Sequence, residues 1–460
     1  MTMNWAKLLN PDRLKPRKPR STVAGDTRDE FDRDYDRIVY STPFRRLQDK
    51  TQVFPLDPND SIRTRLTHSL EVSRAACGMA KDVCKQLLDR QFITTDQAKS
   101  IETIAATCGL LHDLGNPPLG HSGEVAIRDW FPTRQPDVLR DLEEPFAKDF
   151  LKFDGNAQTL RLVTHLQILA DYHGLDLTCG TLSAACKYVA ASNEIAEHPH
   201  ECSKVGFFMS ERDNVDKIRE KAGTGQARNP IAFLVEAADD AVYNAVDLED
   251  GFRKGILDWA FLKSELEDTC QDDEVLKDCI EWTEGRLKDP EVSLQGRAKD
   301  NAHIQYFRVR AVGHVVTACA EAFIAHYDEI MEGAYHGELV NDSRTSAFVH
   351  ACRDLNRSHV YCSDETLKLE LMGRNIIWDL MDLFWEGVKH ADADPERKET
   401  RTFAGKTFSL LSDNYRSVFQ HAMKGKKFPE TYCRLQLLTD YICGMTDTFA
   451  AALHRRLMNG

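Results

Sequence analysis

Two histidines and two carboxylates lie within the fifteen-residue segment Leu110-Leu111-His112-Asp113-Leu114-Gly115-Asn116-Pro117-Pro118-Leu119-Gly120-His121-Ser122-Gly123-Glu124. Apolar residues recur at helical spacing from about 100 to 114, which predicts an amphipathic helix with His112 on its buried face. Gly115 ends this helix, and Pro117 and Pro118 delay the start of the next one. We therefore expect His121 and Glu124 to lie just past a sharp bend and to return toward His112 and Asp113.

An isolated His-Asp pair is more often a buried imidazole with a hydrogen-bonded neighbour than a metal site. A divalent cation needs several ligands from different elements, and imidazole and carboxylate groups suit Mn, Fe, Co, Ni or Zn. Two other predicted helices supply such groups, with His68 in the first turn of one and Asp239 within the other, over 233–247. In the second helix Asp239, Tyr243 and Asp247 are spaced four apart and share one face. The alternative is a helix that turns these polar residues toward water.

His68, His112-Asp113 and Asp239 form the H…HD…D pattern of the HD-domain metal-dependent phosphohydrolases. Between about 27 and 255 the local sequence contains five further ordered runs: Tyr40-Ser41-Thr42-Pro43-Phe44-Arg45-Arg46-Leu47-Gln48-Asp49-Lys50-Thr51-Gln52-Val53-Phe54-Pro55-Leu56, Thr64-Arg65-Leu66-Thr67-His68-Ser69, His112-Asp113-Leu114-Gly115-Asn116-Pro117-Pro118, Phe153-Asp154-Gly155-Asn156-Ala157-Gln158 and Glu236-Ala237-Ala238-Asp239-Asp240. In these runs the chain resembles one family of that superfamily, the deoxyguanosine triphosphate triphosphohydrolases.

The resemblance implies a divalent cation, Mn²⁺ or Mg²⁺ with Fe, Co, Ni or Zn as further candidates, held by His68, His112, Asp113 and Asp239. Such an ion keeps open positions for a water and a phosphate oxygen, and it lowers the pKa of that water. Because the 5′-oxygen of a nucleoside is a poor leaving group, the site also needs a general acid. We expect this acid to be His121, with Glu124 orienting it; the alternative for His121 is a capping or structural role.

Six positions resemble the family's substrate contacts: Gln52, Asn156, Lys187, Lys204, Tyr243 and Asp247. Arg65 and Arg46 lie in the matching runs and are further candidates to bind the triphosphate. A triphosphate needs cations and oriented donors, which the basic residues of this set would supply, although a surface lysine is the ordinary alternative for any one of them. The resemblance further implies that Tyr243 packs against the sugar and leaves no room for a 2′-hydroxyl, while Asp247 and Gln52 hydrogen-bond the sugar or base.

The predicted fold is all-α, an HD-domain helical fold with an additional C-terminal helical region and at most a few short strands. We expect a basic N-terminal arm over 1–25, a catalytic domain over 26–255 and a helical region for packing and oligomerisation over 256–460. Residues 11–20 contain five basic side chains and three prolines, which favours an extended, mobile arm, with a phosphate-contacting arm as the alternative. A brief strand is expected near 204–209, and a helix carrying Lys187 over 183–191.

Composition narrows the class of protein. The formal charge of 59 − 73 = −14 argues against a protein that coats nucleic acid or anionic membrane over its whole surface. The thirteen cysteines include no C-x-x-C pair, which favours reduced, buried thiols. No apolar run reaches 18 residues and the N-terminus has no signal-peptide pattern, so we expect a cytoplasmic protein with no membrane partner.

The expected function is hydrolysis of a deoxynucleoside triphosphate, dGTP above all, to the deoxynucleoside and inorganic triphosphate. One alternative is a different HD-domain nucleotide phosphohydrolase, and another is a DNA-binding regulatory protein with an HD fold. The resemblance also implies single-stranded DNA binding as an added activity. A short match around Tyr361 and Leu367–Leu371 implies a segment that reaches a neighbouring active site, and hence a homo-oligomer, with a hexamer as one candidate.

Overall fold

The computed structural model describes residues 2–15, 25–57, 59–167, 172–288, 294–390 and 401–458. These residues are mostly helical, and the strands among them are β1 (Ala190–Ala191) and β2 (Val205–Phe207), which pair in parallel. The all-α prediction is therefore confirmed. None of the described helices combines the length and the apolar character that crossing a bilayer requires.

The chain divides into two compact units. Unit 1 comprises Met1–Trp5, Gln52–Leu110 and Pro230–Leu369, and unit 2 comprises Ala6–Thr51, Leu111–Asn229 and Glu370–Gly460. Each unit is thus assembled from segments that are far apart in the sequence. The predicted division into an arm, a catalytic domain and a C-terminal region stays a prediction.

Unit 1 is built around one central helix, α12 (Pro230–Lys254), in which almost every residue is buried. It packs against α4 (Arg65–Asp89) and α15 (Arg297–Ala325), which also pack against each other. The frequent alanines of α12 allow this close approach on several sides. The other helices of this unit are α13 (Trp259–Thr269), α14 (Glu274–Leu287), α16 (Tyr327–Glu332), α17 (Ser346–Leu355) and the π-helical turn η5 (Asn356–Val360).

Helix α5 (Thr95–Leu111) crosses α4 at a backbone contact. A Cβ atom on Gly109 would lie 2.5 Å from the Cα of Ser73, so only glycine fits there. One turn away, the Ser73 hydroxyl donates a hydrogen bond to the carbonyl of Ala106 at 2.8 Å. The end of α5 is therefore fixed against α4 close to the His-Asp pair in the sequence.

Unit 2 gathers short helices from the N-terminal half and longer ones from the C-terminal part of the chain. Its elements before residue 230 are α2 (Glu30–Val39), α3 (Thr42–Arg46), η1 (Leu47–Asp49), α6 (Gly120–Arg134), α7 (Pro136–Arg140), α8 (Glu144–Leu151), α9 (Gly155–Arg161), η2 (Leu162–Leu166), α10 (Cys179–Ala185), β1, η3 (His200–Cys202), β2, η4 (Met209–Glu211) and α11 (Arg212–Ala222). Its later helices are α19 (Phe403–Ser409), α20 (Asp413–Gly425), α21 (Glu430–Cys443) and α22 (Asp447–Met458). Helices α1 (Trp5–Leu8) and α18 (Asp364–Lys389) run from one unit into the other.

A buried ion-pair network joins the early and late helices of unit 2. The Arg161 guanidinium donates to both carboxylate oxygens of Asp440, at 2.8 and 2.6 Å, and to Glu211 at 3.0 Å. Burial opposes ionisation of Glu211, but the arginine beside it holds the pKa of that carboxyl below its usual value. Bidentate pairing of this kind fixes α21 against α9.

The strand near 204–209 is confirmed, but the helix predicted over 183–191 is wrong. Helix α10 begins earlier, because the Thr178 side chain accepts a hydrogen bond from the Thr181 amide and caps it, and it ends at Ala185. Beyond it the chain extends to pair with β2, where a Cβ on Gly206 would lie 2.0 Å from the carbonyl oxygen of Tyr188. This tertiary pairing overrides the local helical periodicity.

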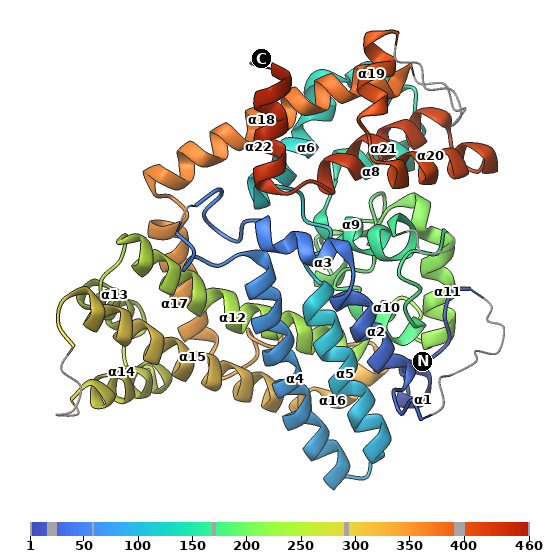
Figure 1. Ribbon diagram of the computed structural model, residues 1–460. Helices are drawn as coiled ribbons and strands as arrows, with labels where there is room; N and C mark the ends of the chain where they lie inside the picture. Colours follow the sequence, from blue (N-terminus) through green and yellow to red (C-terminus); the bar gives the residue numbers. More distant parts are fainter. Residues whose placement is uncertain are drawn as a thin grey trace. The chain divides into compact units, whose positions relative to one another are not determined.

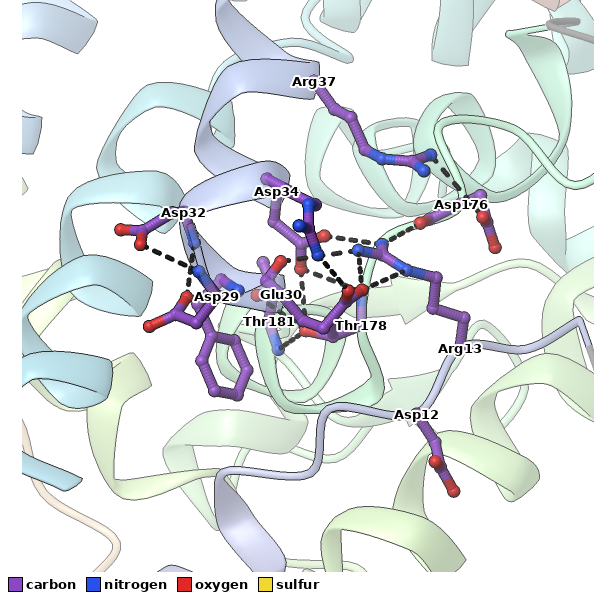
Figure 2. A network of polar contacts seen from close by, with 12 residues as sticks. Asp12, Arg13, Asp29, Glu30, Asp32, Asp34, Arg37, Asp176, Thr178 and Thr181 are labelled. Atoms are coloured by element: carbon purple, nitrogen blue, oxygen red, sulfur yellow. Dashed lines mark hydrogen bonds and ion pairs between the residues drawn. The ribbon is translucent and has the colours of Figure 1, made fainter. Parts of the chain in front are cut away.

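Arg13, in the described part of the predicted N-terminal arm, is fixed within unit 2 (Figure 2). The Arg13 side chain is buried and forms ion pairs with Asp34 at 2.6 Å and Glu30 at 2.8 Å. Asp34 also accepts hydrogen bonds from the amide and the hydroxyl of Thr178. The expectation of a mobile arm is therefore wrong at Arg13, whose charge is neutralised inside the unit. Residues 16–24 lie outside the described residues.

Candidate functional site

Unit 1 brings together two of the expected metal ligands. His68 is buried in the first turn of α4, and its Nε2 lies 3.1 Å from Oδ1 of Asp239 on α12. The two helices pack directly against each other, which places residues 171 positions apart in hydrogen-bonding contact. An imidazole and a carboxylate from two rigid helices form half of the donor set that the sequence predicts.

Asp247 lies two turns after Asp239 on α12 and is only 2% exposed. Its Oδ2 accepts a hydrogen bond of 2.5 Å from the Tyr361 hydroxyl, while Oδ1 has no partner among the described residues. Burial raises the pKa of Asp247 to about 7, and the tyrosine lowers it only in part. Tyr361, which the resemblance placed at a neighbouring site, thus contacts Asp247 of its own chain.

Tyr243 lies between Asp239 and Asp247 on the same helix and is partly exposed. Burial raises the pKa of its hydroxyl, so the side chain remains neutral over the physiological range. The guanidinium of Arg353 lies 6.0 Å from the centroid of the Tyr243 ring. Of the other two substrate candidates in unit 1, Arg65 is buried at the start of α4 and Gln52 is partly buried.

Sequence reasoning missed Arg63, which fixes the entry to the His68 helix. Its guanidinium donates to Asp250 at 2.8 Å, to Glu249 at 2.6 Å and to Glu71 at 3.0 Å. Its position just before the matched Thr64–Ser69 run was the only available signal, because two of its three partners, Glu249 and Asp250, come from α12, far along the chain.

Unit 2 contains the other two expected ligands. Helix α5 ends at Leu111, earlier than predicted, so His112 and Asp113 lie in the turn that follows it. His112 Nε2 lies 3.6 Å from Asp113 Oδ2, and the side-chain amide of Asn116 donates to Asp113 Oδ1. The turn rests on α9, since the Thr159 hydroxyl donates to the His112 carbonyl at 3.2 Å.

Two glycines let this turn approach α9 closely. A Cβ on Gly115 would lie 2.1 Å from the Thr159 nitrogen, and a Cβ on Gly155 would lie 2.1 Å from Oδ1 of Asn116. Any side chain at either position would push the His-Asp turn away from the helix.

The proposed acid and its orienting carboxylate lie near the start of α6, at its second and fifth residues. His121 Nδ1 lies 3.9 Å from Glu124 Oε1, and the histidine side chain is 79% exposed. The Glu124 Oε2 accepts a hydrogen bond from the Gly155 amide at 3.0 Å. Burial raises the pKa of Glu124, and the nearby Asp154 carboxylate raises it further. The pair is thus an accessible imidazole beside a carboxyl that holds its proton above its usual range.

The remaining substrate candidates lie around the same part of unit 2. Asn156 donates through its amide and its side chain to Asp154, both at 2.8 Å. The ammonium groups of Lys187 and Lys204 lie 5.8 and 5.7 Å from the ring centroid of Tyr188. Sequence reasoning missed Tyr188, because the strand pairing that positions it leaves no local signal.

Comparison with known proteins identifies the family. The chain is 36% identical to a deoxyguanosinetriphosphate triphosphohydrolase-like protein of Listeria monocytogenes, over 99% of both chains. The chain belongs to the deoxyguanosinetriphosphate triphosphohydrolase family. Another such protein, from Synechocystis, is 32% identical over 99% of both chains, and a deoxyguanosinetriphosphate triphosphohydrolase of Enterobacter is 31% identical over 93% of both. No family model matches the chain.

The donor chemistry of this family member fits a divalent ion. Unit 1 supplies an imidazole and a carboxylate already in contact, and unit 2 supplies another adjacent pair. Mixed nitrogen and oxygen donors without thiolates suit Mn²⁺ and its first-row neighbours, and carboxylates also suit Mg²⁺. The residues present are therefore compatible with the cofactor that the sequence predicts.

Proposed function

We propose that this protein hydrolyses dGTP to deoxyguanosine and inorganic triphosphate, with a divalent cation held by His68, His112, Asp113 and Asp239. The observation that carries the proposal is the partly buried contact of 3.1 Å between His68 and Asp239, in a chain that is similar to named triphosphohydrolases over nearly its whole length. When bound, such an ion supplies a water of lowered pKa and polarises a phosphate oxygen.

The His121–Glu124 pair is suited to protonating the leaving group. An imidazolium at His121 would donate its proton to the 5′-oxygen of the nucleoside, while Glu124 orients the ring from its Nδ1 side at 3.9 Å. The exposure of His121 makes the ring accessible to a nucleotide. The Gly155 amide holds Glu124 in place, so the carboxyl need not rearrange when the imidazole changes charge.

Two groups of residues would recognise the nucleotide, the first by its charge and the second by the shape and hydrogen bonding of its sugar and base. Lys187 and Lys204 converge on the Tyr188 ring and offer two ammonium groups to the triphosphate. Tyr243 would pack against the sugar and exclude a 2′-hydroxyl. Asp247 has a carboxylate oxygen with no partner among the described residues, and this oxygen would accept a hydrogen bond from the sugar or base.

Incubation of the full chain with each of the four deoxynucleoside triphosphates and with GTP, in Mn²⁺ or Mg²⁺, tests the proposal. Ion-exchange chromatography of the products should show triphosphate from dGTP. Monophosphate or pyrophosphate would instead indicate another HD-domain phosphohydrolase. No turnover together with DNA binding would indicate a regulatory protein.

A matched pair of variants tests the metal ligands. Asp239→Asn should abolish turnover and manganese binding, because it removes a charged oxygen donor from the His68 contact. Asp82→Asn, on an exposed position of α4, should retain both. Wild-type manganese binding by Asp239→Asn would refute the ligand set.

Two partner predictions rest on the resemblance, and the prediction of location rests on the lack of a long apolar run and of a signal-peptide pattern. Homo-oligomer formation, single-stranded DNA binding and cytoplasmic location stay predictions. The exposed apolar residues Leu367 and Leu371 on α18, 45% and 67% exposed, support contact with another subunit. Comparison of the wild type with a Leu371→Lys variant by sedimentation would test the prediction of a homo-oligomer.

A further inference from the structure

Three described elements of unit 2 meet at a single buried carboxylate. Asp447, the first residue of α22, is 2% exposed. Its Oδ1 accepts a hydrogen bond from the Leu119 amide at 2.7 Å. Its Oδ2 accepts one from the Thr51 amide at 2.9 Å, and the Thr51 hydroxyl donates to the same oxygen. The carboxylate thus joins α22 to the residue just before the His121 helix.

Leu119 needs such support. Its φ of 64° lies in the left-handed region, which residues with a Cβ rarely adopt, and it immediately precedes α6. The direction in which α6 leaves the Asn116–Leu119 turn depends on this conformation. The hydrogen bond to Asp447 fixes the Leu119 amide, and with it the start of α6, where His121 and Glu124 lie.

A buried lysine holds the other side of the same turn. The Lys50 ammonium donates to the carbonyls of Asn116 and Cys443, the latter at 2.7 Å, and the residue is 3% exposed. A buried ammonium requires such acceptors, so these contacts are costly to break. Because the Asn116 side chain donates to Asp113, Lys50 acts on a metal-ligand candidate through one intermediate residue.

We propose that Lys50, Thr51, Cys443 and Asp447 form a clasp that positions the Asp113–Leu119 turn for metal binding. The inference rests on the proposed function, and it gives α21 and α22 a role within the site of their own chain. Residues that orient a metal ligand without touching the metal usually alter its affinity for the ion. The four clasp residues are positioning residues.

The variant Asp447→Asn tests the clasp with almost no change in shape. An asparagine has one oxygen, whereas the carboxylate accepts from the Leu119 amide on one side and from Thr51 on the other. In either orientation, the amide nitrogen of the new side chain faces a backbone N–H, and one of the two donors loses its acceptor. The matched control is Asp413→Asn, in the first turn of α20, where the carboxylate is 88% exposed.

The measurements use the full chain. Without metal, hydrogen exchange of the peptide that contains Leu119 should be about tenfold faster in Asp447→Asn, because a hydrogen bond to a charged group is lost. Manganese titration by calorimetry should show an affinity about tenfold weaker. Saturating manganese should restore turnover, which loss of folded protein would not allow. Asp413→Asn should match the wild type in all three.

Each outcome decides the inference. If Asp447→Asn shows the wild-type rate of hydrogen exchange at the Leu119 peptide and the wild-type affinity for manganese, the proposed clasp is wrong. If that variant does not fold, Thr51→Val removes one donor only and should change both readouts in the same direction by a smaller factor, so wild-type values there would also overturn it. A wild-type protein that bound no manganese would overturn the proposed function instead, and the exchange measurement, which needs no metal, would still decide whether Asp447 holds the turn.

Discussion

The buried carboxyl of Asp149 predicts a specific dependence of stability on pH. Burial raises its pKa from 3.8 to about 7, although Ser192, Tyr432 and the Met209 amide all donate hydrogen bonds to it and lower the pKa. Between these two pKa values the folded protein binds more protons than the unfolded chain. The stability contribution is therefore fully present below pH 3.8 and is lost as the pH rises through about 7.

Asp149→Asn removes this proton while it keeps the contacts. The asparagine oxygen can accept from Tyr432 and Met209, and its amide can donate to Ser192, whose hydroxyl can turn to the Pro145 carbonyl at 3.3 Å. One pKa unit corresponds to about 1.4 kcal/mol, and the folded carboxyl is already half ionised at pH 7. Between pH 5 and 7 the stability of the variant relative to wild type should therefore rise by about 2 kcal/mol.

Urea denaturation at pH 5, 6, 7 and 8, with chelator present throughout, measures this difference. The control is Asp137→Asn, whose carboxylate is 87% exposed in the same unit. The difference in free energy of unfolding between Asp149→Asn and wild type should rise with pH and level off above 7, whereas that of the control should stay flat. A difference for Asp149→Asn that does not change with pH would refute the reasoning.

Three further predictions concern packing, charge and metal. Gly115→Ala should lower the melting temperature and turnover, because the new Cβ would lie 2.1 Å from the backbone of α9. The control Gly78→Ala, where α4 has open space, should be neutral or stabilising by up to about 1 kcal/mol. Equal melting temperatures for the two variants would contradict this. Arg161→Met should cost about 3–5 kcal/mol by stranding Asp440, as measured by urea denaturation, and a loss below about 1 kcal/mol would count against it. Manganese at 100 times its Kd should stabilise the wild-type protein against thermal unfolding by about 2.7 kcal/mol, whereas the stability of His68→Ala should not change. A similar gain in stability for His68→Ala would exclude His68 as a ligand.

Local sequence patterns predicted those parts of the fold that depend on neighbours along the chain. The helical periodicity predicted the helices that carry His68 and Asp239, and tight packing of these helices places the two side chains in contact. The same reasoning failed at Lys187, where pairing with β2 determines the backbone, and at Arg13, whose partners lie on α2. Composition alone suggested a solvated arm, because it carries no information about distant carboxylates.

The parts of the candidate site that sequence could not predict depend on long-range polar contacts. Asp447 lies 328 residues from Leu119, and nothing in the sequence around either residue indicates the hydrogen bond. The raised pKa of Glu124 likewise follows from burial and from Asp154, which the sequence places thirty residues away. Motif matching identified candidate ligands, whereas their supporting contacts required coordinates.

The pairing of Arg161 with Asp440 also constrains how the protein is made. The ribosome synthesises Asp440 279 residues after Arg161, so the nascent chain carries an arginine whose final partner does not yet exist. Unit 2 cannot complete this buried ion-pair network until α21 has been synthesised, and a ribosome that stalled before α21 would release a product in which Arg161 lacks Asp440.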